Sequence, residues 1–238
     1  SVPLRDFFAR PTLQALAETL DRRLSERALG SSDDVELDVI VEPEREVRLS
    51  LPALPSEHSP ETPRQILLTG ATGQVGSYLV AAILAQWPRA TLHCLVRAKS
   101  ASAGLQRVRD ALARQALEVP ELTQRVRIVP GDLAAPGLGL SEARLGELAA
   151  TIDLIVHNGA VLNHMATYSA LRAANVDATV ALLQLAATRR LKRFVYISTQ
   201  AVFNVRKNRK WVDETTDIHQ EAHTASAGYD ATKWIAEL

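Results

Sequence analysis

The chain has 238 residues, and its 27 Lys and Arg balance its 27 Asp and Glu, so the formal net charge is zero. This balance argues against a nucleic-acid partner, because proteins that bind nucleic acid usually carry a basic surplus. The one cysteine, Cys94, cannot form a disulfide within the chain, and without a Cys/His cluster we expect no metal site. The sequence shows neither a signal peptide nor a membrane-spanning apolar run, so we expect a cytoplasmic protein with no membrane partner.

The N-terminal residues predict a helix followed by a linker. Apolar side chains recur at helical spacing in residues 11–24, after a Pro-Thr pair that suits the start of a helix. The acidic residues 30–47 and the proline-rich residues 51–63 lack this pattern and predict an extended, partly solvated segment. We interpret the acidic run as solvated surface rather than as a binding site. The chain is therefore divided into residues 1–29, 30–63 and 64–238.

From residue 64 onward, strand and helix patterns alternate. The strand patterns are nearly continuous apolar runs, as expected for strands that are buried on both faces of a parallel sheet. This alternation predicts right-handed crossovers and a Rossmann-like, doubly wound α/β sheet with strand order 3-2-1-4-5. The expected strands are 65–70, 91–98, 125–133, 152–160 and 193–199, and the expected helices are 75–87, 103–117, 141–150, 168–188 and 227–238.

A glycine cluster, "TGATGQVG", lies between the first strand and the first helix of this alternation. Gly70 permits a tight turn, Gly73 lets the backbone approach a pyrophosphate, and Gly76 lets the helix pack closely on the sheet. Glycines also serve ordinary turns. Their position between a strand and a helix nevertheless favours dinucleotide binding. The loop residues expected to contact the cofactor are Gly70, Thr72, Gly73, Gln74, Val75 and Gly76.

The second strand indicates which dinucleotide is bound. It ends in "CLVRAKS", with Arg97 and Lys99 where an NAD-preferring site usually has an acidic residue. A guanidinium there suits the 2′-phosphate of NADP. Arg107, ten residues on, can reach the same phosphate or can be an ordinary surface arginine, and the sequence leaves both open.

Two more strand ends carry candidate cofactor contacts. The third strand ends near the expected adenine, and the fourth near the expected nicotinamide ribose, because ligands of such sheets bind at the carboxyl ends of the strands. The neighbouring His157 and His164 have no Ser or Asp partner in sequence, so we interpret them as structural. The expected contacts are Asp132 and Leu133 after the third strand, and Asn158, Gly159 and Ala160 after the fourth.

Tyr229 and Lys233 lie four residues apart near the start of the last helix, in "GYDATKWIAEL". This spacing puts both on one helix face. A lysine cation beside a phenol lowers the pKa of the phenol, so Tyr229 would act as a proton donor or oxyanion stabiliser at neutral pH. Thr199, at the end of the fifth strand, offers a hydroxyl to the same site.

With these motifs in this order, residues 64–238 resemble the extended short-chain dehydrogenase/reductases. Within them, the chain is most similar to the terminal thioester reductase domains of nonribosomal peptide synthetases, polyketide synthases and carboxylic acid reductases. The N-terminal "SVPLRDFFARPTLQALAETL" resembles the last helices of a carrier protein. The stretches that carry the reductase resemblance are "ILLTGATGQVGSYL", "CLVRA", "VHNGAVLNHMATYSALRAANV" and "FVYISTQAVF".

The resemblance implies a carrier tail over residues 1–29, a linker over 30–63 and an NADP-binding subdomain over 64–238. The carrier's phosphopantetheine serine is then expected upstream of Ser1. The family's C-terminal substrate subdomain is expected to be missing from this chain, which would make the chain a fragment. The partners implied are the carrier and the other modules of a multidomain synthetase.

The implied activity is NADPH-dependent release of a carrier-bound acyl or peptidyl thioester as an aldehyde, or further to an alcohol. Tyr229 and Thr199 would stabilise the oxyanion, and Lys233 would hold the nicotinamide ribose and tune Tyr229. Asn175 would support the ribose or a water relay, or would only pack. The alternatives are another extended reductase, such as a fatty acyl-CoA or nucleotide-sugar enzyme, and an NADP-binding fragment that is inactive alone.

Overall fold

The computed structural model describes residues 54–203, 212–224 and 227–238, together with residues 12, 14, 15, 17–22, 41, 42, 47 and 49. Residues 14, 15 and 17–22 are helical, which confirms the helix that the N-terminal periodicity predicts. The Thr12 hydroxyl accepts a hydrogen bond of 3.1 Å from the Ala15 N–H and so caps this helix. The remaining N-terminal residues lie outside the described residues, and the predictions that concern them stay predictions.

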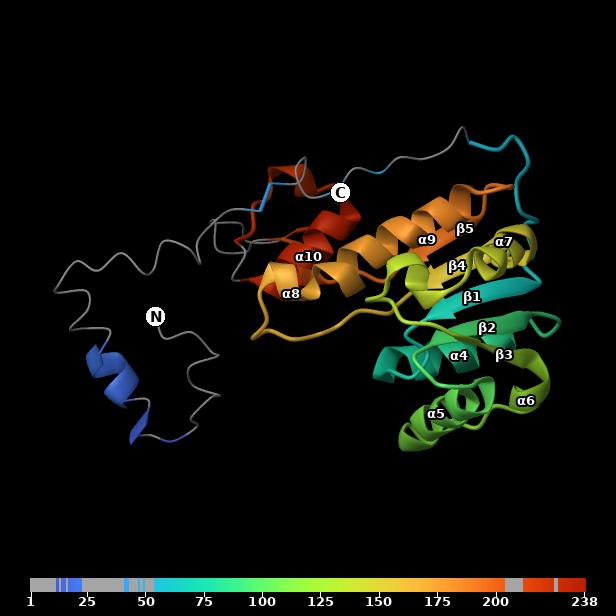
Figure 1. Cartoon of the computed structure of the whole chain (residues 1–238), viewed down its shortest axis with the longest axis horizontal. Helices are drawn as coiled ribbons and strands as arrows, with labels where there is room; N and C mark the ends of the chain where they lie inside the picture. Colours follow the sequence, from blue (N-terminus) through green and yellow to red (C-terminus); the bar gives the residue numbers. More distant parts are fainter. Residues whose placement is uncertain are drawn as a thin grey trace.

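Five parallel strands form one sheet in the order β3-β2-β1-β4-β5 (Figure 1), which confirms the predicted order and the Rossmann-like fold. Because all the strands are parallel, their carboxyl ends meet at one edge of the sheet, where such folds bind ligands. The strands are β1 (Gln65–Thr69), β2 (Thr91–Val96), β3 (Val126–Pro130), β4 (Leu154–His157) and β5 (Arg193–Tyr196).

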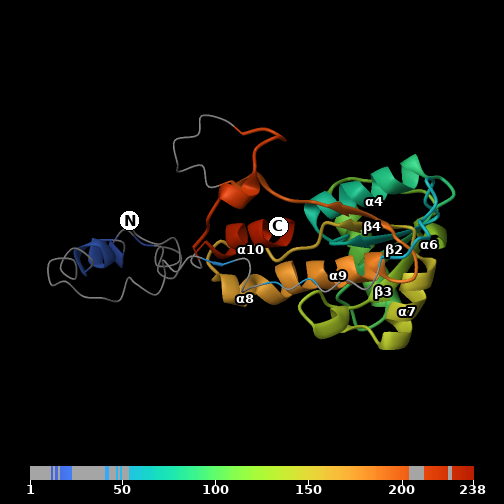
Figure 2. The ribbon, with the colours of Figure 1, turned by 90° about the horizontal axis from the view of Figure 1, so that it is seen from above.

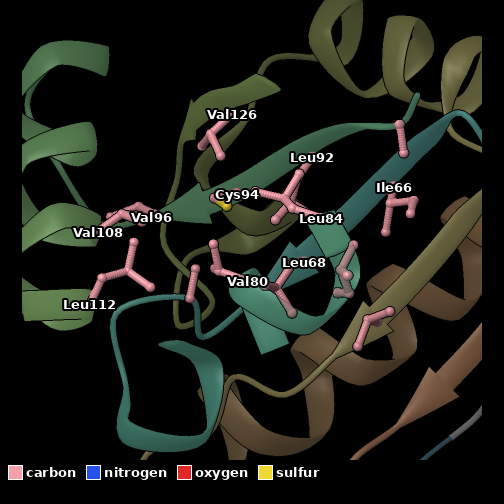
Figure 3. Packing of buried hydrophobic residues seen from close by; sticks show 14 of the residues in the cluster. Ile66, Leu68, Val80, Leu84, Leu92, Cys94, Val96, Val108, Leu112 and Val126 are labelled. Carbon is pink, nitrogen blue, oxygen red and sulfur yellow. The ribbon is translucent and has the colours of Figure 1, made fainter. Parts of the chain in front are cut away.

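Helices cover both faces of the sheet (Figure 2). On β1, Ile66 and Leu68 point to one face and pack with α4 and α5 (Figure 3), whereas Leu67 points to the other and packs with α7 and α9. All three side chains are fully buried, so the central strand is apolar on both faces, as its sequence predicts. The helices on the first face are α4 (Gln74–Gln86), α5 (Ala101–Arg114) and the short α6 (Leu122–Arg125); α7 (Glu142–Thr151) and α9 (Ala178–Ala187) cover the second.

The helix expected over residues 168–188 contains a turn of π-helix. It consists of α8 (Tyr168–Arg172), the π-helical η2 (Ala173–Asp177) and α9, and the Ala178 N–H bonds to the Ala173 carbonyl five residues back. One widened turn cannot be recognised from the hydrophobic periodicity of the sequence, because the apolar residues of the flanking turns keep their helical spacing. The π-helix holds Asn175, whose contacts are described below.

Helix α10 (Gly228–Glu237) and the 3₁₀ turn η3 (Gln200–Val202) lie at the carboxyl edge of the sheet. Helix α10 packs against α8, η2 and η3. Figure 1 shows α10 beside α8, at the end of the sheet where the strands terminate. The sequence does not predict α6 or the 3₁₀ turns η1 (Pro136–Gly139), η3 and η4 (Ile218–Gln220), because they are too short to produce a periodic pattern.

The described part of the expected linker is extended and largely exposed, yet it is attached to the globular unit. His58 forms a parallel bridge with Leu191, and the Leu191 N–H donates to the Glu57 carbonyl at 2.8 Å. Upstream, Val41 is only 5% exposed, packs with Trp234 of α10, and donates its N–H to the His223 carbonyl at 2.9 Å. Among the described helices, none has the length and hydropathy that crossing a bilayer would require.

Candidate active site

The glycine loop forms a cradle at the carboxyl end of β1. Gly70 has φ +72°, and a Cβ there would lie 2.8 Å from the Gly159 Cα. A Cβ on Gly76 would lie 1.9 Å from the Gly70 carbonyl oxygen, so loop and helix are in direct contact. The positive φ of Gly70 fits the tight turn that the sequence predicts, and Gly76 is required because α4 packs closely on the glycine loop, where the sequence analysis expects close packing on the sheet.

Gly73 differs, because a Cβ there would meet only the Gly70 carbonyl oxygen, at 3.4 Å, and otherwise open space. Gly73 is the N-cap of α4, which has no side-chain cap, and Gln74 and Val75 behind it are exposed. The first N–H groups of a helix have no partner within the helix, and its N-terminus carries a partial positive charge. The cradle therefore fits a pyrophosphate group.

A cavity of about 420 Å³ lies beside this cradle, at the ends of β2 and β3. It brings together Arg97, Lys99 and Asp132, all of which the sequence assigns to the cofactor. Arg107 reaches the same edge, since its guanidinium donates a hydrogen bond to the Arg97 carbonyl. The residues that line the cavity are Arg97, Ala98, Lys99, Pro130, Gly131, Asp132 and Gly139.

Leu133, after β3, and the loop after β4 contact each other at the carboxyl edge of the sheet. A Cβ on Gly159 would lie 2.6 Å from a methyl group of Leu133, which packs against the core. The Gly159 N–H donates to the Thr69 hydroxyl at 2.8 Å, and the Asn158 amide donates to the Gly70 carbonyl at 3.4 Å. This loop therefore packs directly on the glycine loop, at the point between β1 and β4 where the strand order reverses.

Helix α10 presents the predicted Tyr-Lys pair at the same edge of the sheet. Lys233 is 3% exposed, and its ammonium donates to the Ile197 carbonyl at 2.7 Å. Tyr229 is partly exposed, with its ring 5.5 Å from that of His164. A Cβ on Gly228 would lie 2.2 Å from the Ala166 carbonyl oxygen, so only glycine lets α10 begin so close to this loop. Sequence reasoning missed Gly228.

The expected effect of Lys233 on the pKa of Tyr229 is wrong for this structure. Burial, and then the nearby Asp230 carboxylate, raise the pKa of Tyr229. The Lys233 ammonium points instead to the Ile197 carbonyl and to the face of the Tyr196 ring, 3.9 Å from its centroid. Spacing on a helix puts two side chains on one face but does not decide which partner each one takes.

Thr199 follows β5 and begins the turn η3. Its hydroxyl accepts a hydrogen bond of 3.3 Å from the Ala201 N–H, and the side chain is partly buried. Thr199 lies two residues after Ile197, the acceptor of the Lys233 ammonium, and η3 packs against α10. The structure thus brings the β5 end and α10 together, as the sequence analysis expects.

Asn175 is 1% exposed, and its side chain is saturated by the protein. Its Oδ1 accepts from the Val161 N–H at 2.7 Å, and its Nδ2 donates to the Val161 carbonyl at 3.1 Å and to the Thr232 hydroxyl at 3.0 Å. This geometry favours the packing role that the sequence left open. The bonds from Asn175 also fix Val161, and the side chains of Val161 and Leu162 are 44% and 64% exposed. Sequence reasoning missed these two apolar side chains.

The two histidines of this region have different surroundings. His157 is 1% exposed and bonded to two threonine hydroxyls, and burial lowers its pKa to about 3, so its ring is neutral. This confirms that His157 is structural rather than a free acid or base. His164 lies edge-on to Tyr229. Among the described residues, no three His, Cys, Asp or Glu side chains lie close enough together to hold a metal ion.

Known proteins resemble the chain over this fold and site. Residues 68–238 match the NAD-binding family model described as male sterility protein. A linear gramicidin synthase protein of Brevibacillus parabrevis is 36% identical over 99% of this chain, which spans 5% of that protein. L-2-aminoadipate reductase of Saccharomyces cerevisiae is 29% identical over 99% of the chain, which spans 19% of that protein.

The terminal R domain from the myxalamid PKS-NRPS pathway is a similar solved structure. It is 37% identical, with a TM-score of 0.71 over 82% of this chain. The present chain spans 50% of that domain.

Proposed function

The chain belongs to the NAD-binding family described as male sterility protein, and from this we propose that it is the NADPH-binding part of a thioester reductase. The observation that carries the proposal is that three groups of residues lie at the same edge of the sheet. These are the glycine cradle, the hydroxyl of Thr199, and α10 with Tyr229 and Lys233. The similarity to an L-2-aminoadipate reductase and to a terminal R domain supports a reductase over a plain nucleotide-binding module.

The cradle and the neighbouring cavity support the preference for NADP. The glycine loop and the start of α4 would hold the pyrophosphate. Arg97 and Lys99 line the cavity at the β2 end, and Arg107 lies beside them. These cations suit a 2′-phosphate, which an acidic residue at the same place would repel.

The dinucleotide, when bound, supplies the hydride that reduces the carbonyl carbon of a thioester. Tyr229 and Thr199 would donate hydrogen bonds to the carbonyl oxygen as it becomes an oxyanion, and Tyr229 would then supply its proton. The raised pKa of Tyr229 keeps the phenol protonated at neutral pH, so it is ready to act as the donor. Lys233 would bind the ribose hydroxyls beside it. Collapse of the hemithioacetal breaks the C–S bond and leaves an aldehyde and a thiol.

We propose a carrier-bound acyl or peptidyl thioester as the substrate. The support is that relatives similar over 99% of the chain, its N-terminal residues included, are large synthetases. On this proposal residues 1–29 are the end of a carrier domain that bears phosphopantetheine, and residues 30–63 connect it to the reductase. The pocket for the acyl group would lie in a C-terminal substrate subdomain of the full-length protein.

A substrate panel with the full-length protein tests this function. NADPH oxidation is measured with an acyl carrier thioester, an acyl-CoA thioester and a nucleotide sugar. We expect oxidation with the carrier thioester and release of an aldehyde. Oxidation with only the nucleotide sugar would make the chain a different extended reductase. NADPH binding without oxidation of any substrate would favour a binding module.

A further inference from the structure

A series of five buried residues connects the nucleotide loop to α10 through hydrogen bonds, with one link made to the backbone of Asn175 and the others made between side chains. Its members come from β1, β4, α9, the π-helix η2 and α10. Each side chain is at most 2% exposed. The members are Thr69, His157, Thr179, Asn175 and Thr232.

The direction of the hydrogen bonds is set at Thr69, the residue before Gly70. Its hydroxyl oxygen accepts from the Asn158 N–H at 3.1 Å and from the Gly159 N–H at 2.8 Å. A hydroxyl accepts two hydrogen bonds and donates one, so the hydrogen of Thr69 is left for His157 Nδ1, 2.7 Å away. His157 Nδ1 is therefore an acceptor.

The remaining bonds follow from that assignment. A neutral imidazole that accepts at Nδ1 carries its proton at Nε2, which donates to the Thr179 hydroxyl at 3.1 Å. Thr179 in turn donates to the backbone carbonyl of Asn175 at 2.8 Å, one helical turn back, and the side chain of Asn175 continues the series. A second proton on His157 would face the hydrogen of Thr69, so only the neutral ring completes the series.

The series ends on α10. The Asn175 amide donates to the Thr232 hydroxyl at 3.0 Å, and that hydroxyl donates to the Tyr229 carbonyl at 2.8 Å. A shift of the nucleotide loop at Thr69 therefore changes the hydrogen bonds that hold the turn of α10 bearing Tyr229 and Lys233.

We propose that His157 is a positioning residue that couples the nucleotide loop to α10, so that a bound dinucleotide orders the helix carrying Tyr229. This rests on the proposed binding of NADPH but not on the identity of the thioester. Since buried polar networks are costly when half satisfied, a single break in the series loosens α10. The coupling requires the hydroxyl of Thr179. A valine at this position keeps the volume of the side chain but removes the hydroxyl.

Hydrogen exchange of the amides of α10, with and without NADPH, tests the coupling. In the wild-type chain we expect NADPH to slow exchange in both residues 70–76 and α10. In Thr179→Val, NADPH still protects residues 70–76, but its protection of α10 falls about three- to tenfold, the equivalent of one net hydrogen bond. Thr179→Ser keeps the hydroxyl and restores the protection. Equal protection of α10 in Thr179→Val and the wild type would overturn the proposal.

A matched control and a direct observation of the ring complete the test. His93 lies on the same sheet and bonds to the Gln65 amide at 2.7 Å, outside the series, so His93→Phe leaves the protection of α10 by NADPH unchanged. Nitrogen chemical shifts of the His157 ring should report Nε2–H, and an Nδ1–H ring would contradict the assignment. Failure of the wild-type chain to bind NADPH would instead count against the proposed function, and the ring measurement does not depend on it.

Discussion

The Lys233 ammonium lies 3.9 Å from the centroid of the Tyr196 ring, so the buried cation on α10 rests on an aromatic side chain from β5. A ring face and one carbonyl stabilise this charge less than water does, and burial lowers the pKa of Lys233 to about 8, although Glu237 opposes the shift. Lys233 therefore changes charge close to physiological pH.

The rate of NADPH-dependent reduction is expected to depend on this titration. Lys233 is charged below its pKa and neutral above it, so the rate should be level below about pH 8 and fall as the pH rises through about 8. In Lys233→Arg the cation stays protonated, so the fall should move above pH 10, where guanidinium groups remain charged. The pH dependence of turnover and of NADPH affinity measures this, and the affinity remains informative where Arg slows turnover.

Lys192 provides the matched control for the pH profile. It is also buried, at 4% exposed, with a pKa lowered to about 8 chiefly by burial, but it precedes β5 at the opposite end of the sheet. Lys192→Gln should leave the alkaline fall in place. A fall that persists unchanged in Lys233→Arg would show that another group causes it.

Replacement of Arg97 should weaken the binding of NADPH specifically. Loss of one charge-assisted bond to the 2′-phosphate is worth roughly 1.5–3 kcal/mol, so Arg97→Ala should raise the Kd for NADPH about 10- to 150-fold. The Kd for NADH should change little. Fluorescence titration measures both constants. Arg109 on the same helix as Arg107 is exposed and bonds to Thr123, so Arg109→Ala is the control, and an equal loss in both variants would refute the assignment.

Leu162 is expected to contact the thioester rather than the dinucleotide. It is 64% exposed next to Val161, which Asn175 holds in place, and it lies two residues before His164, whose ring contacts that of Tyr229. Leu162→Asp should raise KM for the thioester about 5- to 30-fold, since it removes roughly 1–2 kcal/mol of apolar contact. NADPH affinity should stay the same. Leu54, 60% exposed in the segment before β1, provides the control, and Leu54→Asp should leave KM unchanged. A loss of NADPH affinity in Leu162→Asp would contradict a role in thioester binding.

The attachment of Val41 to α10 should be measurable as protection from proteolysis. A carboxylate at this buried position costs more than the segment gains by docking, so Val41→Asp should release it and lower stability by about 2 kcal/mol. Limited proteolysis between residues 41 and 54 and thermal unfolding report the two effects. Leu49→Asp, at a residue 42% exposed, should change neither. Resistance of Val41→Asp to cleavage at the wild-type rate would rule out the attachment.

The sequence predicts the sheet well because its inner strands are short, largely apolar runs, although the edge strands β3 and β5 are only partly buried, unlike strands that are covered on both faces. β1 and β4 are buried on both faces, and β1 accordingly has three consecutive apolar residues, Ile66, Leu67 and Leu68. The glycine loop can also be predicted from the sequence, because Gly70 and Gly76 leave no room for a side chain. Both features depend on local residue types.

Contacts between residues that are far apart in the sequence cannot be predicted in this way. The partner of Lys233 is the Ile197 carbonyl, 36 residues away, and nothing in the spacing of α10 indicates it. The π-turn at Asn175 and the outward position of Leu162 likewise depend on one side chain that bridges two segments. Attachment of the predicted linker at His58 and Val41 depends on residues far along the chain, which proline and acidic content do not reveal.

Tyr229→Phe isolates the role of the Tyr229 hydroxyl as the proton donor in thioester reduction. The variant keeps the ring that packs on His164 and removes only the hydroxyl, so fold and NADPH affinity should be preserved. Single-turnover NADPH oxidation by the full-length protein on a carrier-bound thioester should fall about 100- to 10,000-fold, the usual contribution of a positioned acid. Tyr78→Phe, at an exposed tyrosine of α4, should react at the wild-type rate. Reduction at the wild-type rate in Tyr229→Phe would show that Tyr229 is not the proton donor.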